Sequence, residues 1–209
     1  MITKDREYRA MPVMAPVTPE MREEGEQENR YDVQGYASTF EPYVLFTDPE
    51  SGTEYKEKID PHAFDDADMS DVIFLYNHEG QVMARQKNGS LRLSVDDHGL
   101  KVAADLSGSA RGREMYEEIR SGLIDQMSFA FTVDEDSYDR MTKTRTIIRM
   151  RKLYDVSAVS MPANPGTDIS ARSAAWIDGA IEQERAERLE AEKRERDKQK
   201  IRLLLQLQE

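Results

Sequence analysis

The sequence predicts an α+β fold, with a mostly antiparallel, β-barrel-like domain, one or more packed helices and a long charged C-terminal helix. Short β-branched and aromatic runs, separated by turns rich in Asp, Gly and Pro, recur through residues 31–172. Over residues 182–200, by contrast, nearly every residue is charged or Gln, which is typical of a solvated helix. We therefore expect an N-terminal arm over 1–30, a folded domain over 31–172 and a helical tail over 173–209.

The composition excludes several classes of protein. Of the 209 residues, 38% are hydrophobic and 33% are charged, which leaves enough apolar side chains for one core. No apolar run approaches the roughly 20 residues that span a bilayer, and no signal-peptide core is present. The absence of Cys excludes disulfides, thiolate zinc sites and a Cys nucleophile. The net charge of −12 disfavours nucleic-acid binding, because a phosphate backbone would be repelled.

The expected elements follow in order along the chain. Residues 1–30 hold three of the eight prolines and a charged run at 22–28, without periodicity, and predict a flexible arm. Period-two alternation over 91–95, followed by an Asp-Asp-His-Gly turn and a returning run over 100–106, predicts a hairpin. Further strands are expected over residues 31–40, 42–46, 53–59 and 72–76.

One helix is expected over residues 110–121. Ser109 suits its N-cap, Met115 and Ile119 share its apolar face, and Gly122 suits its C-terminal stop. The chain then returns to extended structure, for which we expect strands at 123–133, 145–150 and 153–159 and a polar loop at 134–144.

The tail has glutamates four residues before arginines, the favourable order on a helix, at 184/188, 190/194 and 192/196. As one helix it would be about 55 Å long, and its apolar stripe is too thin for a coiled coil. The apolar end at 201–207 indicates a partner, self-association or a continuation of the chain.

The three histidines are the candidate bases for a serine nucleophile, since a base that titrates near neutrality is needed. His98 lies in a turn, and an exposed turn position explains it; His62 follows Pro61 and suggests a structural or surface role. His78 ends the apolar run 72–76, where a rigid strand can hold a catalytic side chain, although a hydrogen-bonded strand-end histidine is the alternative. No local histidine pair of the H-E-x-x-H type occurs, so no metal is expected.

Ser128 and Asp155 are polar residues within apolar strands. Ser128 follows Met127 and precedes Phe129-Ala130-Phe131, where an ordinary strand serine is the simplest interpretation. Burial of Asp155 is costly without a partner. A histidine and a nearby arginine are both candidate partners, and the residues alone leave the choice open.

Several segments, taken together in their order and spacing, indicate a family relationship more specifically than any one of them does. They are 58–64, the strand ending at Asn77-His78, the turn at 96–100, the helix end at 118–122, 126–131, and 153–165 with its closing x-V-S-x-V-x-x-P-A-N-P. Over about residues 31–170 the chain resembles the prohead (procapsid) maturation proteases of tailed bacteriophages, which are distantly similar to the herpesvirus assembly protease. It differs in having His62 and Ala130 where glycine is common, and Asp155 where Glu is common.

The resemblance implies a serine endopeptidase of capsid maturation that needs no cofactor. It implies that Ser128 is the nucleophile, that His78 is the general base and that Asp155 orients His78. The N–H groups of 111–113 and of Gly122 are candidates for stabilising the oxyanion. The implied substrates are the scaffold protein or the scaffold-like segment of the major capsid protein, and the protease itself.

The same resemblance implies a setting and partners. The expected location is the bacterial host cytoplasm, inside the assembling procapsid, and a homo-oligomer is a further candidate. The net charge and the lack of a long apolar run separately predict that neither nucleic acid nor a membrane is a partner. The tail would be either a handle for packaging or a solvated spacer. The alternative function is a non-enzymatic scaffold or assembly-interaction protein, in which the tail is the working part.

Overall fold

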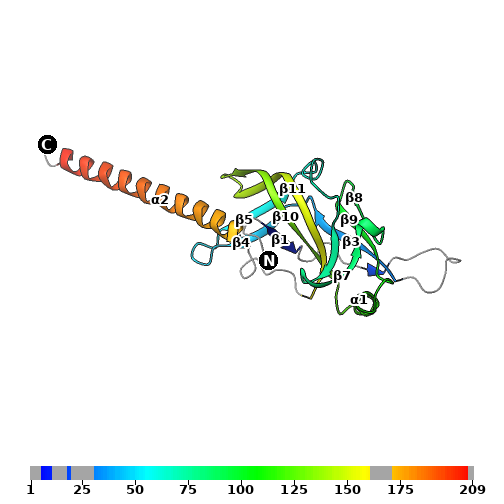
Figure 1. The fold of residues 1–209 in the computed structure, drawn as a ribbon. Coiled ribbons are helices and arrows are strands. Elements are labelled where there is room, and N and C mark those ends of the chain that lie inside the picture. Colours follow the sequence, from blue (N-terminus) through cyan, green and yellow to red (C-terminus); the bar gives the residue numbers. More distant parts are fainter. Residues whose placement is uncertain (1–5, 11–17, 20–30, 161–170, 207–209) are drawn as a thin grey trace. The chain divides into compact units, whose positions relative to one another are not determined.

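The structure, a computed structural model, describes residues 6–10, 18–19, 31–160 and 171–206. The chain divides into two units, residues 1–170 and residues 171–209. The expected α+β class is confirmed: the first unit holds two mostly antiparallel sheets and a packed helix, and the second is a long helix (Figure 1). Neither sheet closes into a barrel in the described part of the chain.

Within the described residues the larger sheet has seven strands and is built around the longest one, β11. β11 pairs with β10 along one edge, and along its other edge it carries β5 and then β6, both in parallel orientation. β5 pairs with the beginning of β11, at 144–147, and β6 pairs with its end, at 155–158. The strands in order are β1 (Glu7–Ala10), β10 (Gln126–Asp139), β11 (Thr144–Val159), β5 (Glu54–Ile59) and β4 (Tyr43–Thr47), with β6 (Ile73–Tyr76) between β11 and β7 (Glu79–Arg85).

The smaller sheet, with four strands in the part of the chain that the structure describes, shares one buried core with the larger sheet. Val33 and Leu100 from the smaller sheet and Phe129 from the larger sheet belong to the same apolar cluster. The predicted hairpin with its turn at 96–98 is confirmed. The strand order is β2 (Thr18–Pro19), β3 (Asp32–Thr39), β9 (Gly99–Asp105) and β8 (Leu91–Val95), and the short 3-10 helix η1 (Gln86–Asn88) precedes β8.

The helix α1 (Ala110–Arg120) begins and ends as its sequence predicts. The Ser109 Oγ accepts a hydrogen bond from the Gly112 N–H, and Met115 and Ile119 are buried. A Cβ at Gly112 would lie 2.3 Å from the carbonyl oxygen of Leu106, so only glycine allows this close approach. The backbone turns out of the helix through Gly122 at φ 74°.

The expectation of a flexible arm does not hold for the described residues before residue 31. β1 pairs antiparallel with β10, and β2 pairs with β3. Periodicity misses β1 because the strand is short and its buried side chains, Glu7 and Arg9, are charged. The charged run at 22–28 lies outside the described residues, as does the P-A-N-P sequence at 162–165.

The polar loop expected at 134–144 is wrong for most of its length. β10 continues to Asp139, and β11 returns from Thr144. This ribbon has few apolar side chains, and ion pairs across it replace them: Arg149 lies 2.8 Å from Asp134 and 2.9 Å from Glu135. β7 was likewise not predicted, since its first four residues are exposed and mostly polar.

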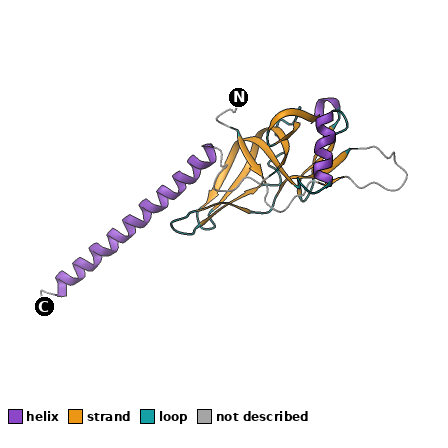
Figure 2. Cartoon of the chain, turned by 90° about the horizontal axis from the view of Figure 1, so that it is seen from below, coloured by secondary structure: helices purple, strands orange, loops and turns teal. Residues whose placement is uncertain are grey.

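The second unit is the single helix α2 (Ala171–Gln206), drawn as one uninterrupted helix in Figure 2. Its 36 residues correspond to about 54 Å. Glu190 and Arg194 form one of the predicted pairs, at 3.3 Å. Leu189 and Ile201 are exposed, and the side chains from residue 203 onward lie outside the described residues. None of the described helices is both long enough and apolar enough to cross a membrane.

Candidate active site

Ser128 lies near the start of β10, the strand between β1 and β11. In the register it is opposite Ser157 on one side and Ala10 on the other. The alternating side chains of a strand place Ser128 on one face of β10. Phe129 and Phe131 stack on the other face, with ring centroids 4.7 Å apart, and pack in the core. The Ser128 side chain is therefore held by a strand that cannot shift without disturbing the core.

His78 lies in the two-residue turn between β6 and β7. Asn77 has φ 47° and His78 has φ 60°, the combination that makes a type I′ turn. Such turns favour Asn-Gly, and a histidine in this conformation costs roughly 1–2 kcal/mol relative to an ordinary backbone conformation. The turn is held to β11 by hydrogen bonds from the Asn77 N–H to the Ala158 carbonyl (3.0 Å) and from the His78 N–H to the Ser157 Oγ (3.2 Å).

The structure brings Ser128, His78 and Asp155 together in one hydrogen-bonded row. His78 Nε2 lies 2.6 Å from Ser128 Oγ, and His78 Nδ1 lies 2.6 Å from Asp155 Oδ1. Because a carboxylate only accepts, Nδ1 carries the proton toward Asp155, and Nε2 has a free lone pair for the Ser128 hydroxyl. Ser128 and Asp155 are 1% and 2% exposed, and the His78 side chain is 16% exposed. Of the three, His78 is thus the most open to solvent.

The parallel pairing of β6 with β11 explains why the shorter acid reaches the histidine. Asp155 pairs with Ile73 and Ala158 with Tyr76, so β6 runs beside β11 and the turn after it lies next to the end of β11, from where the His78 side chain reaches Asp155. The sequence left a histidine and an arginine as candidate partners of Asp155, and the structure pairs it with the histidine. Its other hydrogen bond, among the described residues, comes from a serine on its own strand.

Ser157 is a member of this cluster that sequence reasoning missed. Its Oγ donates to Asp155 Oδ1 at 3.0 Å, accepts the His78 N–H and lies 3.3 Å from His78 Nδ1. The residue is fully buried. The available signal was its spacing: a serine two residues after an aspartate in a strand lies on the same face as that aspartate.

The other two histidines lie on the surface. His62 is 83% exposed on its side chain and pairs with Asp65 at 3.0 Å. His98 is exposed, as expected for the 96–99 turn, and its ring packs edge-on against Tyr36. His78 also packs against a tyrosine. The ring centroid of Tyr8, in β1, lies 4.7 Å from that of His78.

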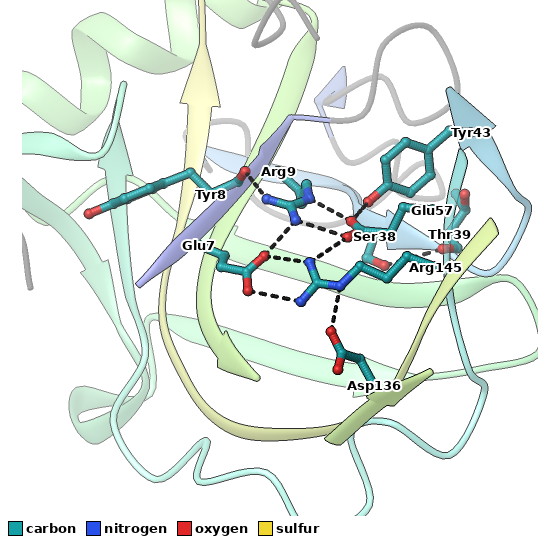
Figure 3. Close-up of polar contacts among 9 residues, drawn as sticks. All are labelled: Glu7, Tyr8, Arg9, Ser38, Thr39, Tyr43, Glu57, Asp136 and Arg145. Atoms are coloured by element: carbon teal, nitrogen blue, oxygen red, sulfur yellow. Dashed lines mark hydrogen bonds and ion pairs between the residues drawn. The ribbon is translucent and has the colours of Figure 1, made fainter. Parts of the chain in front are cut away.

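A buried cluster of charges lies on the other face of β1 (Figure 3). We call Glu7, Arg9, Glu57 and Arg145 the charge cluster; each is at most 3% exposed. Arg9 Nε lies 2.5 Å from Glu57 Oε1, and Arg145 Nη1 lies 2.9 Å from Glu7 and 3.0 Å from Glu57. The two acids and two bases thus neutralise one another, which is the condition for burying charge.

The pairing in the charge cluster shifts the pKa of its members. Burial alone would raise the pKa of the Glu57 carboxyl, but the guanidinium groups of Arg9 and Arg145 outweigh it and the pKa is lowered. Burial likewise opposes the charge of Arg9, yet Glu57 raises the pKa of that guanidinium well above its ordinary value. Tyr43 donates a short hydrogen bond to Glu57, and burial together with the Glu57 charge raises the pKa of its hydroxyl.

The backbone donors that the sequence suggested for an oxyanion are mostly engaged elsewhere. The Gly112 N–H donates to Ser109 Oγ, and the Arg113 N–H donates to the Ser109 carbonyl. The Gly122 N–H donates to the Ile119 carbonyl. These groups complete the ends of α1, as helix termini require, and the expectation is corrected for them.

Comparison with protein-family models gives a match that covers most of the chain. The family model described as caudovirus prohead serine protease matches residues 18–178. That range contains Ser128, His78 and Asp155, and it begins after β1. Searches of curated proteins and of solved structures gave no match.

Proposed function

Because the chain belongs to the caudovirus prohead serine protease family, we propose that it is the serine endopeptidase of capsid maturation, with Ser128, His78 and Asp155 as its catalytic residues. The observation that carries the proposal is the row from Ser128 Oγ to His78 Nε2 and from His78 Nδ1 to Asp155, with 2.6 Å at each contact. Proton transfer from a serine nucleophile to its base requires separations of about 2.6–3.2 Å.

The geometry supports a two-stage hydrolysis. Ser128 Oγ attacks the peptide carbonyl while its proton passes to His78 Nε2, and the carboxylate of Asp155 stabilises the resulting imidazolium. The tetrahedral intermediate then collapses, as His78 returns the proton to the leaving amine and an ester remains on Ser128. Water, deprotonated by His78, hydrolyses the ester and restores the serine.

Membership of the family supports procapsid components as the substrates. We infer that the finer targets are the scaffold protein or the scaffold-like segment of the major capsid protein, and the enzyme's own chain. The reaction takes place inside the assembling procapsid, in the host cytoplasm. None of the steps requires a cofactor.

Intact-mass spectrometry tests the proposal directly. The wild type, Ser128→Ala and a control, Ser38→Ala, are each expressed alone and together with the cognate capsid protein. Ser38 is a buried serine of β3 in the smaller sheet, which makes it a matched substitution outside the row. We expect defined fragments from the wild type and from Ser38→Ala that are absent from Ser128→Ala. Identical masses in all three, while the capsid protein assembles, would instead favour a non-enzymatic role in assembly.

A further inference from the structure

β1 brings a tyrosine to the proposed general base. In the antiparallel register Tyr8 is opposite Ala130, and Ala10 is opposite Ser128. Since side chains alternate along each strand, Tyr8 lies on the same face of the sheet as Ser128. Its ring contacts the imidazole of His78 edge-on, at 4.7 Å between centroids and 68° between planes.

This contact supports the imidazole on a side that its hydrogen bonds leave unsupported. Both ring nitrogens of His78 are already engaged, with Asp155 and with Ser128. Those bonds lie in the plane of the imidazole, whereas an aromatic ring packed at a steep angle restricts rotation of the ring about its side-chain bond. The backbone of His78 is held by the hydrogen bond from its N–H to the Ser157 Oγ, so the Tyr8 ring adds a contact at the imidazole itself.

The charge cluster makes β1 a fixed part of the fold rather than a displaceable strand. Glu7 and Arg9, on either side of Tyr8, are 0% and 3% exposed and bind Arg145 and Glu57. Figure 3 shows the Tyr8 ring directed away from these partners, on the opposite side of the strand. Withdrawal of β1 would separate charges that are paired away from water, which is strongly unfavourable.

We propose that β1 is part of the active site and that Tyr8 is a positioning residue, which holds the His78 imidazole in line between Asp155 and Ser128. The inference rests on the proposed function, and it extends the site to a segment before residue 18, where the family match begins. The charge cluster holds β1 in place through Glu7 and Arg9, and β1 in turn holds Tyr8 against His78.

The test compares full-length Tyr8→Phe and Tyr8→Leu with a matched control, Tyr36→Leu. Tyr36 packs edge-on against His98 at 4.5 Å, so the control removes the same kind of pair at a different histidine. The first readout is nitrogen NMR of the imidazole groups, which reports the tautomer of each of the three histidines. The second is the rate at which diisopropyl fluorophosphate labels Ser128, followed by intact mass, with Ser128→Ala as the blank.

We expect one fixed tautomer for His78 in the wild type and in Tyr8→Phe, with equal labelling rates. Tyr8→Leu should show exchange between tautomers at His78 and label at least about tenfold more slowly, while His62 and His98 keep their wild-type signals. Tyr36→Leu should change the signal of His98 alone and label at the wild-type rate.

Two results would overturn the inference. One is a Tyr8→Leu variant with the tautomer and labelling rate of the wild type. The other is loss of the His62 and His98 signals together with that of His78, which would show general unfolding in place of a local effect. A wild type with a fixed His78 tautomer but no labelling of Ser128 would count against the proposed function and leave the NMR comparison to decide the role of Tyr8.

Discussion

Asp155 Oδ1 lies 2.6 Å from His78 Nδ1, although 77 residues separate the two in the chain. The contact exists because β6 pairs in parallel with the end of β11 and the turn after β6 is hydrogen-bonded to Ser157 and Ala158 of that strand. A buried carboxylate, a turn histidine and a strand serine are thereby aligned without any of them being neighbours in sequence.

Asp155→Asn should nearly abolish cleavage while leaving the fold intact. The amide keeps the shape of the carboxylate but can hold the opposite imidazole tautomer, for which a loss of about 10⁴-fold in kcat is typical of serine proteases. The rate of capsid-protein cleavage measures the effect. Asp65→Asn is the control, because Asp65 pairs with the exposed His62, and its rate should match the wild type. Equal rates for both variants would exclude Asp155 from the mechanism.

His78→Gly and His78→Ala should both be inactive and yet differ in stability. The position has φ 60°, which glycine adopts freely and alanine does not. We expect the glycine variant to have a free energy of unfolding about 1 kcal/mol higher than the alanine variant. Urea unfolding followed by circular dichroism measures the difference. An alanine variant as stable as the glycine variant would show that the turn relaxes when the imidazole is removed.

Ser157→Ala should reduce both stability and activity. The substitution removes the acceptor of the His78 N–H and a donor to Asp155 at a fully buried position, and an orphaned buried group costs about 1–3 kcal/mol. We expect kcat to fall about tenfold or more, with KM little changed, because the missing hydroxyl disturbs the alignment of His78 with Asp155 and Ser128. Ser160→Ala is the comparison, since Ser160 is exposed and bonds to Asn77. Similar kinetics for the two variants would contradict a role for Ser157.

Arg9→Met should destabilise the protein severely. It leaves Glu57 with one guanidinium fewer in a buried site, and removal of one partner of a buried pair typically costs about 3–5 kcal/mol. Chemical unfolding at neutral pH measures the change. Arg151→Met, which removes an exposed arginine paired with Asp134, should have little effect. A small effect of Arg9→Met would mean that the charge cluster contributes little to holding β1.

Glu57 should make stability depend on pH in the acid range. Its pKa is lower in the folded protein than in the unfolded chain, where it is near 4.3. The stabilisation is therefore present above that value and is lost as the pH falls below it through the folded-state pKa. Glu57→Gln should be less stable at pH 7 and show a flatter decline between about pH 5 and pH 2. The exposed control Glu41→Gln should follow the wild-type curve; a Glu57→Gln curve parallel to the wild type would disprove the assignment.

Elements made by neighbouring residues were predictable from the sequence. Ser109 and Gly122 mark the ends of α1, the alternation over 91–106 encodes the β8–β9 hairpin, and the charge pattern after residue 171 encodes a long helix. Each depends on contacts within a few residues, which local spacing records.

The catalytic candidates were also named from the sequence, by a resemblance in the order of motifs. The distances between these residues could not be predicted from the sequence, and neither could the contacts that Ser157 and Tyr8 make with His78. A strand serine and a tyrosine in an expected arm carry no local mark of the histidine they contact.

The sequence by itself thus determined the fold class, the local elements and the identity of the candidate residues. Only the tertiary structure decided that β1 joins the larger sheet, that β6 runs parallel to β11 and that Glu7, Arg9, Glu57 and Arg145 are buried together. The physical reason is the range of the interactions. Hydrophobic periodicity predicts which apolar faces are buried, whereas a buried charge or a strand register is stabilised by partners far away in the chain, and these become defined only when the sheet is complete.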